Sequence, residues 1–362
     1  MPIHDKRLQL DLQQIRQAVA SMGEGVEIAL KNAVQALLSG NEPLANMTVL
    51  MDYALDRQYR EVEQLCHAFI ARFLPSAGHL RLVSSAMRMV NDLERIADYA
   101  VNISRESLDL PNRPTGVLKQ ELETMASIVR TMLRQSLFAF ADGNIPLAEN
   151  TMRMNLQLGS QMEQAIRFLI EEGDSHTGHS REIMDLYVVF IMLERVGNRA
   201  TNLCEEIIFW LSGSRPPPKP LHILFLDEEN NALGLMAEAI ARKSYDTHCH
   251  FYSAGRTPTR EADPNAVAFM RTLGFDLAGM RPKSIATMDV QKMDLMIALQ
   301  GEVRSYIVKP PFHTIFLSWD VGQFAARIDE VSTQRCLEEI YRELAVQLRQ
   351  LMDLVSGSRE SG

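Results

Sequence analysis

The sequence has few cysteines, no long apolar run and no cluster of basic residues. Its four cysteines, among 362 residues, are scattered without the spacing of a metal-binding motif, which predicts a reducing, cytoplasmic setting. The longest apolar run, residues 186–193, is far shorter than the ~20 residues that a membrane-spanning helix needs. The first residues also lack the basic and apolar regions of a signal peptide.

The charge balance limits the classes of partner. The net charge is -9, and no Lys/Arg cluster is present. Nucleic acid is therefore not expected as a partner, because its phosphates are bound through clustered basic side chains. Purely electrostatic docking on anionic lipid is disfavoured for the same reason, so contact with a membrane is expected only through partner proteins.

A polar helical motif near residue 90 returns about one hundred residues later. Its matching positions are Glu94, Arg95, Asp98 and Asn102 in the first copy and Glu194, Arg195, Asn198 and Asn202 in the second. The Glu, the Asp or Asn, and the final Asn are spaced at i, i+4 and i+8, so each copy is predicted to be a helix with one polar stripe. Gly-Asn-Glu-Pro-Leu-Ala at 40–45 likewise returns as Gly-Asn-Ile-Pro-Leu-Ala at 143–148. The chain therefore contains a tandem repeat.

The repeat and the helical periodicity predict an all-α domain made of two three-helix bundles, at 1–110 and 115–212. The proline-rich stretch 213–220 predicts an extended linker. Beyond it, strand and helix patterns alternate, which predicts an α/β domain with a parallel sheet over 221–355. Strands are expected at 222–226, 250–253, 294–298 and 314–317, and the final helix is expected at 336–355. The tail, 356–362, is predicted to be disordered.

Two motifs in the first domain suggest a family: Pro75-x-x-Gly78-x-Leu80-Arg81, and Asp92-Leu-Glu-Arg-Ile-x-Asp98-x-Ala-x-Asn102-Ile103. With the duplicated three-helix bundle, they resemble the PhoU phosphate-signalling proteins over roughly residues 5–212. The resemblance implies a protein that represses the phosphate-starvation response by contacting other proteins. The expected partners are the ATPase subunit of a phosphate transporter, a sensor histidine kinase, or both.

The PhoU resemblance also implies carboxylates that can hold metal ions on the motif helices. The candidate ligands are Glu94, Asp98, Asp52 and Asp56 in bundle one and Glu194 in bundle two. Bundle two has Asn198, Asn155 and Gly159 where bundle one has acids, so a divalent or ferric ion, if one binds, would be held by bundle one rather than bundle two. The alternative is a polar, partly solvated helix face whose acids pair with neighbouring arginines, with no cofactor required.

The second domain carries a different set of motifs: residues 222–239, Ser253-Ala-Gly255, Gly274-Phe-Asp276 and Arg281-Pro-Lys-Ser284. They resemble the low-molecular-weight tyrosine phosphatases and the thioredoxin-coupled arsenate reductases, over residues 221–355. That resemblance implies a nucleophilic Cys at the end of the first strand, an Arg six residues later followed by Ser or Thr, and a late Asp as general acid. The matching positions are Asp227, Leu233, Gly234 and Gln323, with Asn230 inside the loop.

These substitutions predict that the second domain is not an enzyme. An Asp does not replace a thiolate nucleophile, and Leu233 offers no donor to a phosphoryl oxygen. Asp227, Glu228 and Glu229 add negative charge where the loop amides would attract an anion. We hypothesise that the Asp227 carboxylate itself occupies the anion cradle. The alternative is a loop that has collapsed.

Together these features predict a cytoplasmic regulator of phosphate uptake and phosphate-starvation signalling that acts by protein contact. The second domain is expected to serve binding or dimerisation. One alternative is an arsenate reductase or phosphatase with an unusual active site. Another is a metal-binding helical protein, which depends on convergence of the bundle-one carboxylates.

Overall fold

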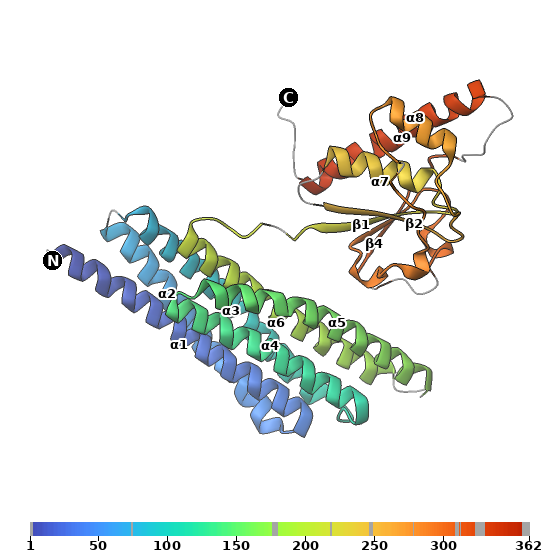
Figure 1. The fold of residues 1–362 in the computed structure, drawn as a ribbon. Coiled ribbons are helices and arrows are strands. Elements are labelled where there is room, and N and C mark those ends of the chain that lie inside the picture. Colours follow the sequence, from blue (N-terminus) through green and yellow to red (C-terminus); the bar gives the residue numbers. More distant parts are fainter. Residues whose placement is uncertain are drawn as a thin grey trace. The chain divides into compact units, whose positions relative to one another are not determined.

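The computed structural model describes residues 3–73, 75–175, 180–217, 219–245, 249–277, 279–307, 311, 313–322 and 330–356. The chain divides into two compact units, Met1–Pro216 and Pro217–Gly362 (Figure 1). Three features predicted from the sequence lie partly or wholly outside the described residues: the tail beyond Ser356, the general-acid position Gln323, and Pro218 of the linker.

The first unit consists of long helices. They are α1 (Ile3–Ser39), α2 (Glu42–Arg72), α3 (Ala77–Asp109), α4 (Gly116–Asp142), α5 (Ile145–Ser175) and α6 (Ser180–Ser212). Helices α1–α3 form one bundle and α4–α6 the other. The two bundles contact each other where α3 packs against α6 and where α1 packs against α4. A single hydrophobic core contains side chains from all six helices. Among the described residues, no helix is long and apolar enough to cross a membrane.

The repeated Gly-Asn-x-Pro-Leu-Ala motif is the turn between the first two helices of each bundle. Gly40 and Gly143 adopt φ values of 70° and 63°, a left-handed conformation that ends α1 and α4 and favours glycine. The following residues, Asn41 and Asn144, each accept a hydrogen bond of 3.0 Å from the backbone N–H three residues ahead. These side chains cap α2 and α5, so both copies of the motif form the same turn.

Repeat counterparts contact each other between the bundles. Glu27 and Arg130 each lie 13 residues before the glycine of the repeated turn, and Arg130 Nη2 is 2.7 Å from Glu27 Oε1. Tyr99 and Arg199 are counterparts in the polar motif, and they hydrogen-bond between α3 and α6. A residue that contacts its own counterpart lies near a two-fold axis. The bundles are therefore related by an approximate two-fold axis between α1 and α4 and between α3 and α6.

The second unit is a parallel sheet with helices. Its elements are β1 (Leu221–Asp227), α7 (Leu233–Ser244), β2 (Cys249–Gly255), α8 (Pro264–Thr272), β3 (Leu295–Ala298), β4 (Ile315–Ser318) and α9 (Glu330–Ser356). The strand order is β2-β1-β3-β4, and every neighbouring pair is parallel.

Two different layers cover this sheet. Phe225 and Ile297 point into a core shared with α7, α8 and α9, and these helices lie on one side of the sheet in Figure 1. Leu224 and Met296 point to the other side, where they pack against segments containing short 3₁₀ helices, Ile285–Thr287, Val290–Lys292 and Val303–Ser305. Strand β1 lies inside the sheet, and its carboxyl end leads directly into the loop before α7. Ligands of such parallel sheets usually bind at the carboxyl ends of the strands.

Candidate functional site

The loop between β1 and α7 encloses the side chain of Asp227. This residue is the last of β1 and is only 3% exposed. Its Oδ1 accepts a hydrogen bond of 2.7 Å from the backbone N–H of Asn230, and its Oδ2 accepts one of 2.8 Å from that of Gly234. Any side chain at position 234 would collide with the Asn230 side chain. The loop amides that would attract an anion therefore bind the protein's own carboxylate.

Burial raises the pKa of the Asp227 carboxyl from its ordinary value of 3.8 to about 6. The two backbone hydrogen bonds act in the opposite direction, and the charges of Glu229 and Glu228 add to the increase. At neutral pH the carboxyl group is mostly ionised and accepts from both amides. The loop thus holds an anion without any external ligand.

A second layer of polar side chains supports the loop from below. Asn230 has φ 49° and is fully buried, and its Oδ1 accepts a hydrogen bond of 2.9 Å from the backbone N–H of Lys283. The ammonium group of Lys283 lies 3.1 Å from Glu238, which also accepts a hydrogen bond from the Ser253 hydroxyl. In the described part of the chain, Asn230 Nδ2 has no hydrogen-bond partner. These contacts hold the loop in one shape.

The solvent-facing side of the loop between β1 and α7 carries less net negative charge than the sequence predicts. Glu228 pairs with Arg256 at 2.9 Å, and this hydrogen bond lowers the pKa of Glu228. Glu229 accepts a hydrogen bond from the Asn231 side chain. Since Asp227 is buried and Arg256 offsets Glu228, the loop does not expose three uncompensated negative charges. Leu233, the first residue of α7, packs in the apolar core, and its side chain has no hydrogen-bond donor for a ligand in the loop.

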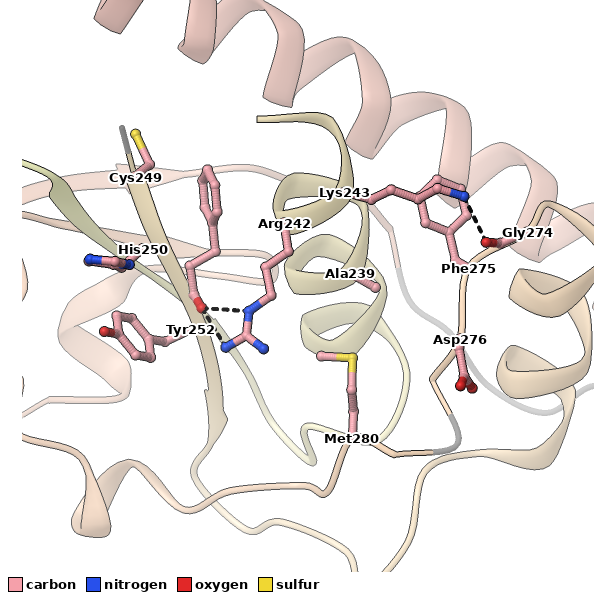
Figure 2. Close-up of a pocket in the computed structure, with 11 residues that line it drawn as sticks. Ala239, Arg242, Lys243, Cys249, His250, Tyr252, Gly274, Phe275, Asp276 and Met280 are labelled. Atoms are coloured by element: carbon pink, nitrogen blue, oxygen red, sulfur yellow. Dashed lines mark hydrogen bonds between the residues drawn. The ribbon is translucent and has the colours of Figure 1, made fainter. Parts of the chain in front are cut away.

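A separate pocket of about 580 Å³ lies beside the edge strand β2 (Figure 2). The two cationic side chains that line the pocket, Arg242 and Lys243, already donate hydrogen bonds to other groups of the protein. Arg242 donates to the carbonyl of Phe251 at 3.0 Å and pairs with Glu238 at 2.7 Å. Lys243 donates to the carbonyl of Gly274 at 2.8 Å. None of the residues that line this pocket belongs to the loop around Asp227, so the pocket is distinct from the loop.

The candidate metal ligands of bundle one lie near one another on α2 and α3. Burial, together with the negative charges of their neighbours, raises the pKa of Asp52, Glu94 and Asp98. Asp56 contributes to that field and lies 3.9 Å from Arg60. In the described ranges, however, no three His, Cys, Asp or Glu side chains form a group that could hold a metal ion. The four carboxylates are thus coupled electrostatically.

The other motif residues occupy different positions. Arg95, Arg195 and Asn198 are exposed, and Glu194 is half-buried on α6. Asn102 accepts a hydrogen bond from Arg105 at 3.5 Å. The sequence therefore predicts one polar stripe, whereas the structure places its members partly at the surface and partly between the bundles.

Two buried acids between α3 and α6 are missed by the sequence analysis. Asp92 accepts hydrogen bonds from Arg199 at 3.0 Å and from Asn202, the last motif residue of the second copy, at 3.4 Å. Asp92 is the first residue of the family motif, and its place in that motif could have identified it as a candidate.

Glu206 is the second of these acids. It accepts from Ser85, Arg88 and Arg215, with Arg215 at 2.5 Å. Its repeat counterpart is also a Glu, Glu106, and this match in the sequence could have pointed to Glu206.

Comparison with known proteins gives a separate result for each unit. Residues 19–107 and 122–207 match the model of the PhoU domain, and residues 222–356 match that of the low molecular weight phosphotyrosine protein phosphatases. The "Phosphate-specific transport system accessory protein PhoU homolog 1" of Thermotoga maritima is 30% identical over 205 residues, which cover 56% of this chain and 88% of that protein.

The crystal structure of PhoU from Pseudomonas aeruginosa is also similar. It has 27% identity and a TM-score of 0.55, and the match covers 57% of this chain and 99% of that one.

Proposed function

This chain belongs to the PhoU family, and we propose on that premise that it is a cytoplasmic negative regulator of phosphate uptake and phosphate-starvation signalling. It acts through protein contacts, and the partners we propose are the ATPase subunit of a phosphate transporter and a sensor histidine kinase. The names of its relatives support this, since they associate those proteins with phosphate-specific transport. The match to nearly the full length of the Thermotoga relative supports a complete PhoU unit.

We further propose that the phosphatase-like unit is not catalytic. The observation that carries this proposal is the Asp227 carboxylate, which accepts from the loop amides of Asn230 and Gly234. In phosphoryl transfer such donors must be free to stabilise the charge that develops on the transferred group. Here they are already bound to an anion, and no thiol stands at the end of β1. The unit therefore retains the scaffold of a phosphate loop for binding rather than for reaction.

The enzymatic alternative is tested with the full-length protein. An aryl phosphate is supplied as one substrate, and arsenate with reduced thioredoxin as the other. We expect no turnover above that of buffer. The control is Asp227→Ala, which removes the side chain inside the loop. Turnover by the wild type that disappears in this variant would show that the loop is an active site.

The regulatory role is tested in cells of the protein's own source. Deleting its gene is expected to raise phosphate uptake under ample phosphate, and the wild-type gene should restore repression. The tagged protein should retain the transporter ATPase subunit or the sensor kinase, in an amount that depends on phosphate supply. Unchanged uptake in the deletion strain would contradict the proposal. Metal binding by the bundle-one carboxylates remains a separate prediction.

A further inference from the structure

The outward face of α2 carries apolar side chains where an amphipathic helix ordinarily carries polar ones. Helix α2 packs against α1 and α3, and its buried residues, among them Leu55 and Val62, lie on the inner face. On the opposite side Met47, Leu50 and Tyr53 are 58%, 58% and 71% exposed. Their spacing of three residues places them in one stripe along the helix. An exposed apolar stripe of this kind marks a contact surface.

The equivalent face of bundle two is mainly polar. The repeated turn relates Met47 to Asn150 and Leu50 to Arg153. Both polar residues are exposed, and Arg153 donates a hydrogen bond of 3.0 Å to Asn150. Of the three positions, only the last keeps an apolar residue, Leu156. The repeat architecture therefore does not require apolar residues on this face, and the continuous stripe is a feature of α2.

Opposite charges flank the apolar stripe on α2. Glu42 lies before it in the first turn of the helix and Arg57 lies one turn after it, and both side chains are exposed. Neither forms an ion pair with any residue that the structure describes. Two parallel copies of this helix would place each charge beside its own copy, whereas two antiparallel copies place Glu42 beside Arg57 at both ends. The face is therefore complementary to itself in the antiparallel orientation.

We propose that α2 forms the two-fold interface of a homodimer by packing antiparallel against α2 of a second copy of this chain. The two-fold axis passes beside Leu50, which contacts its own copy. An apolar residue tolerates this position, whereas a charged residue would meet a like charge there. Met47 then contacts the exposed Ala54 of the second copy, and Glu42 pairs with Arg57 at each end of the interface.

The size of the stripe predicts a weak, reversible dimer. Large apolar and aromatic side chains each have roughly 150–250 Å² of surface, so the exposed parts of these three side chains amount to roughly 400 Å² per copy. With the flanking residues, the two copies together approach the ~1,200 Å² at the lower end of specific interfaces. We therefore expect a dissociation constant in the micromolar range. The dimer is independent of the phosphate-signalling role proposed above.

Sedimentation equilibrium of the full-length protein over micromolar concentrations measures this association. Leu50→Glu places two carboxylates together at the axis, and we expect it to raise the dissociation constant of the dimer at least tenfold. Arg153→Glu is the matched control, because Arg153 is exposed and is the repeat counterpart of Leu50 on α5. We expect this control to change the constant less than twofold. Unchanged urea unfolding midpoints verify that both variants fold.

A charge exchange tests the antiparallel orientation. Glu42→Lys alone or Arg57→Glu alone places like charges beside each other, so we expect each to weaken the dimer about threefold or more. The double variant restores opposite charges and should recover the affinity of the wild type. Leu50→Cys gives a second readout: the native cysteines are buried, so mild oxidation should link two copies through position 50, whereas Arg153→Cys should not link them.

Three results would overturn the proposal. A wild-type protein that stays monomeric at every concentration has no such interface. A dimer that Leu50→Glu leaves intact, or that Arg153→Glu weakens equally, is held by another surface or by general charge effects. A dimer that Leu50→Glu dissociates but that the double charge exchange fails to restore does not have the antiparallel arrangement.

Discussion

The pKa of Asp227 makes the stability of the phosphatase-like unit depend on pH. The folded protein raises this pKa from 3.8 to about 6, so the native state binds the proton more tightly than the unfolded chain does. Protonation therefore favours folding. The contribution is fully present below pH ~4 and is lost as the pH rises through about 6, which is the reverse of the usual behaviour of a paired carboxylate.

The size of the effect follows from the shift. A gap of about two pKa units corresponds to about 3 kcal/mol, at 1.36 kcal/mol per unit. Asp227 is only 3% exposed, so solvent screens little of this free energy. We expect the free energy of unfolding of this unit to fall by about 2–3 kcal/mol between pH 4 and pH 7 because of Asp227 alone.

Urea unfolding measures this free energy within the full chain. The protein has two tryptophans, and Trp319 is buried in the core beside Phe225. In a Trp210→Phe background, Trp319 fluorescence reports on the phosphatase-like unit alone. The pKa is measured directly by following the ¹³C resonance of the Asp227 carboxyl group, which should titrate near pH 6.

Asp227→Asn is the matched variant. An Asn amide places a donor against a backbone N–H of the loop, so we expect a loss of about 1–3 kcal/mol at all pH values. The Asn side chain cannot titrate, so the pH-dependent part of the free energy of unfolding should disappear in this variant. The two proteins differ only at position 227, so the difference between the two pH profiles isolates Asp227. Identical slopes from pH 4 to pH 7 would show that the carboxyl group is not buried in the loop.

Three further predictions concern the loop and the helical unit. Asp227→Gly should free the two loop amides and give the full-length protein millimolar or tighter affinity for inorganic phosphate in calorimetry; equal heats from the wild type would contradict a loop occupied by its own carboxylate. Glu206→Ala should destabilise the helical unit to urea by about 1–3 kcal/mol because it leaves the buried hydroxyl of Ser85 without its acceptor, while the half-exposed Arg215 can turn to water, whereas Glu123→Ala should change it by less than about 0.5 kcal/mol. Gly23→Leu should cost about 1–3 kcal/mol because Leu137 occupies that space, and an unchanged urea midpoint would mean that Leu137 can move aside without cost.

Much of the fold can be predicted from the sequence, because periodicity and turn chemistry are local. Five of the six long helices, all except α5, end at a Gly-Asn-x-Pro turn or shortly before a proline, so these local signals mark where they end. The start of α9 is the largest error: the prediction begins it at Cys336, whereas the helix begins at Glu330. The residues between carry few apolar side chains, so no periodic pattern marks that first turn.

The candidate site is less predictable, because it depends on which groups meet across the fold. A family motif can identify Asp227, but only the structure shows its carboxylate between two loop amides. The sequence also overestimates the negative charge on the solvent-facing side of the loop, since Arg256, the ion-pair partner of Glu228, lies 28 residues farther along the chain. Asp92 and Glu206 are missed because their arginine partners come from other segments of the chain.

Differences between the two copies of the repeat stabilise the contact between the two bundles. A residue that lies on an exact two-fold axis contacts its own copy, so two identical bundles would place like charges together at the axis and could form no ion pair at that point. Here the counterparts Glu27 and Arg130 carry opposite charges and pair at 2.7 Å. Tyr99 likewise contacts a different residue type, Arg199. The favourable contacts at the axis therefore require that the copies differ.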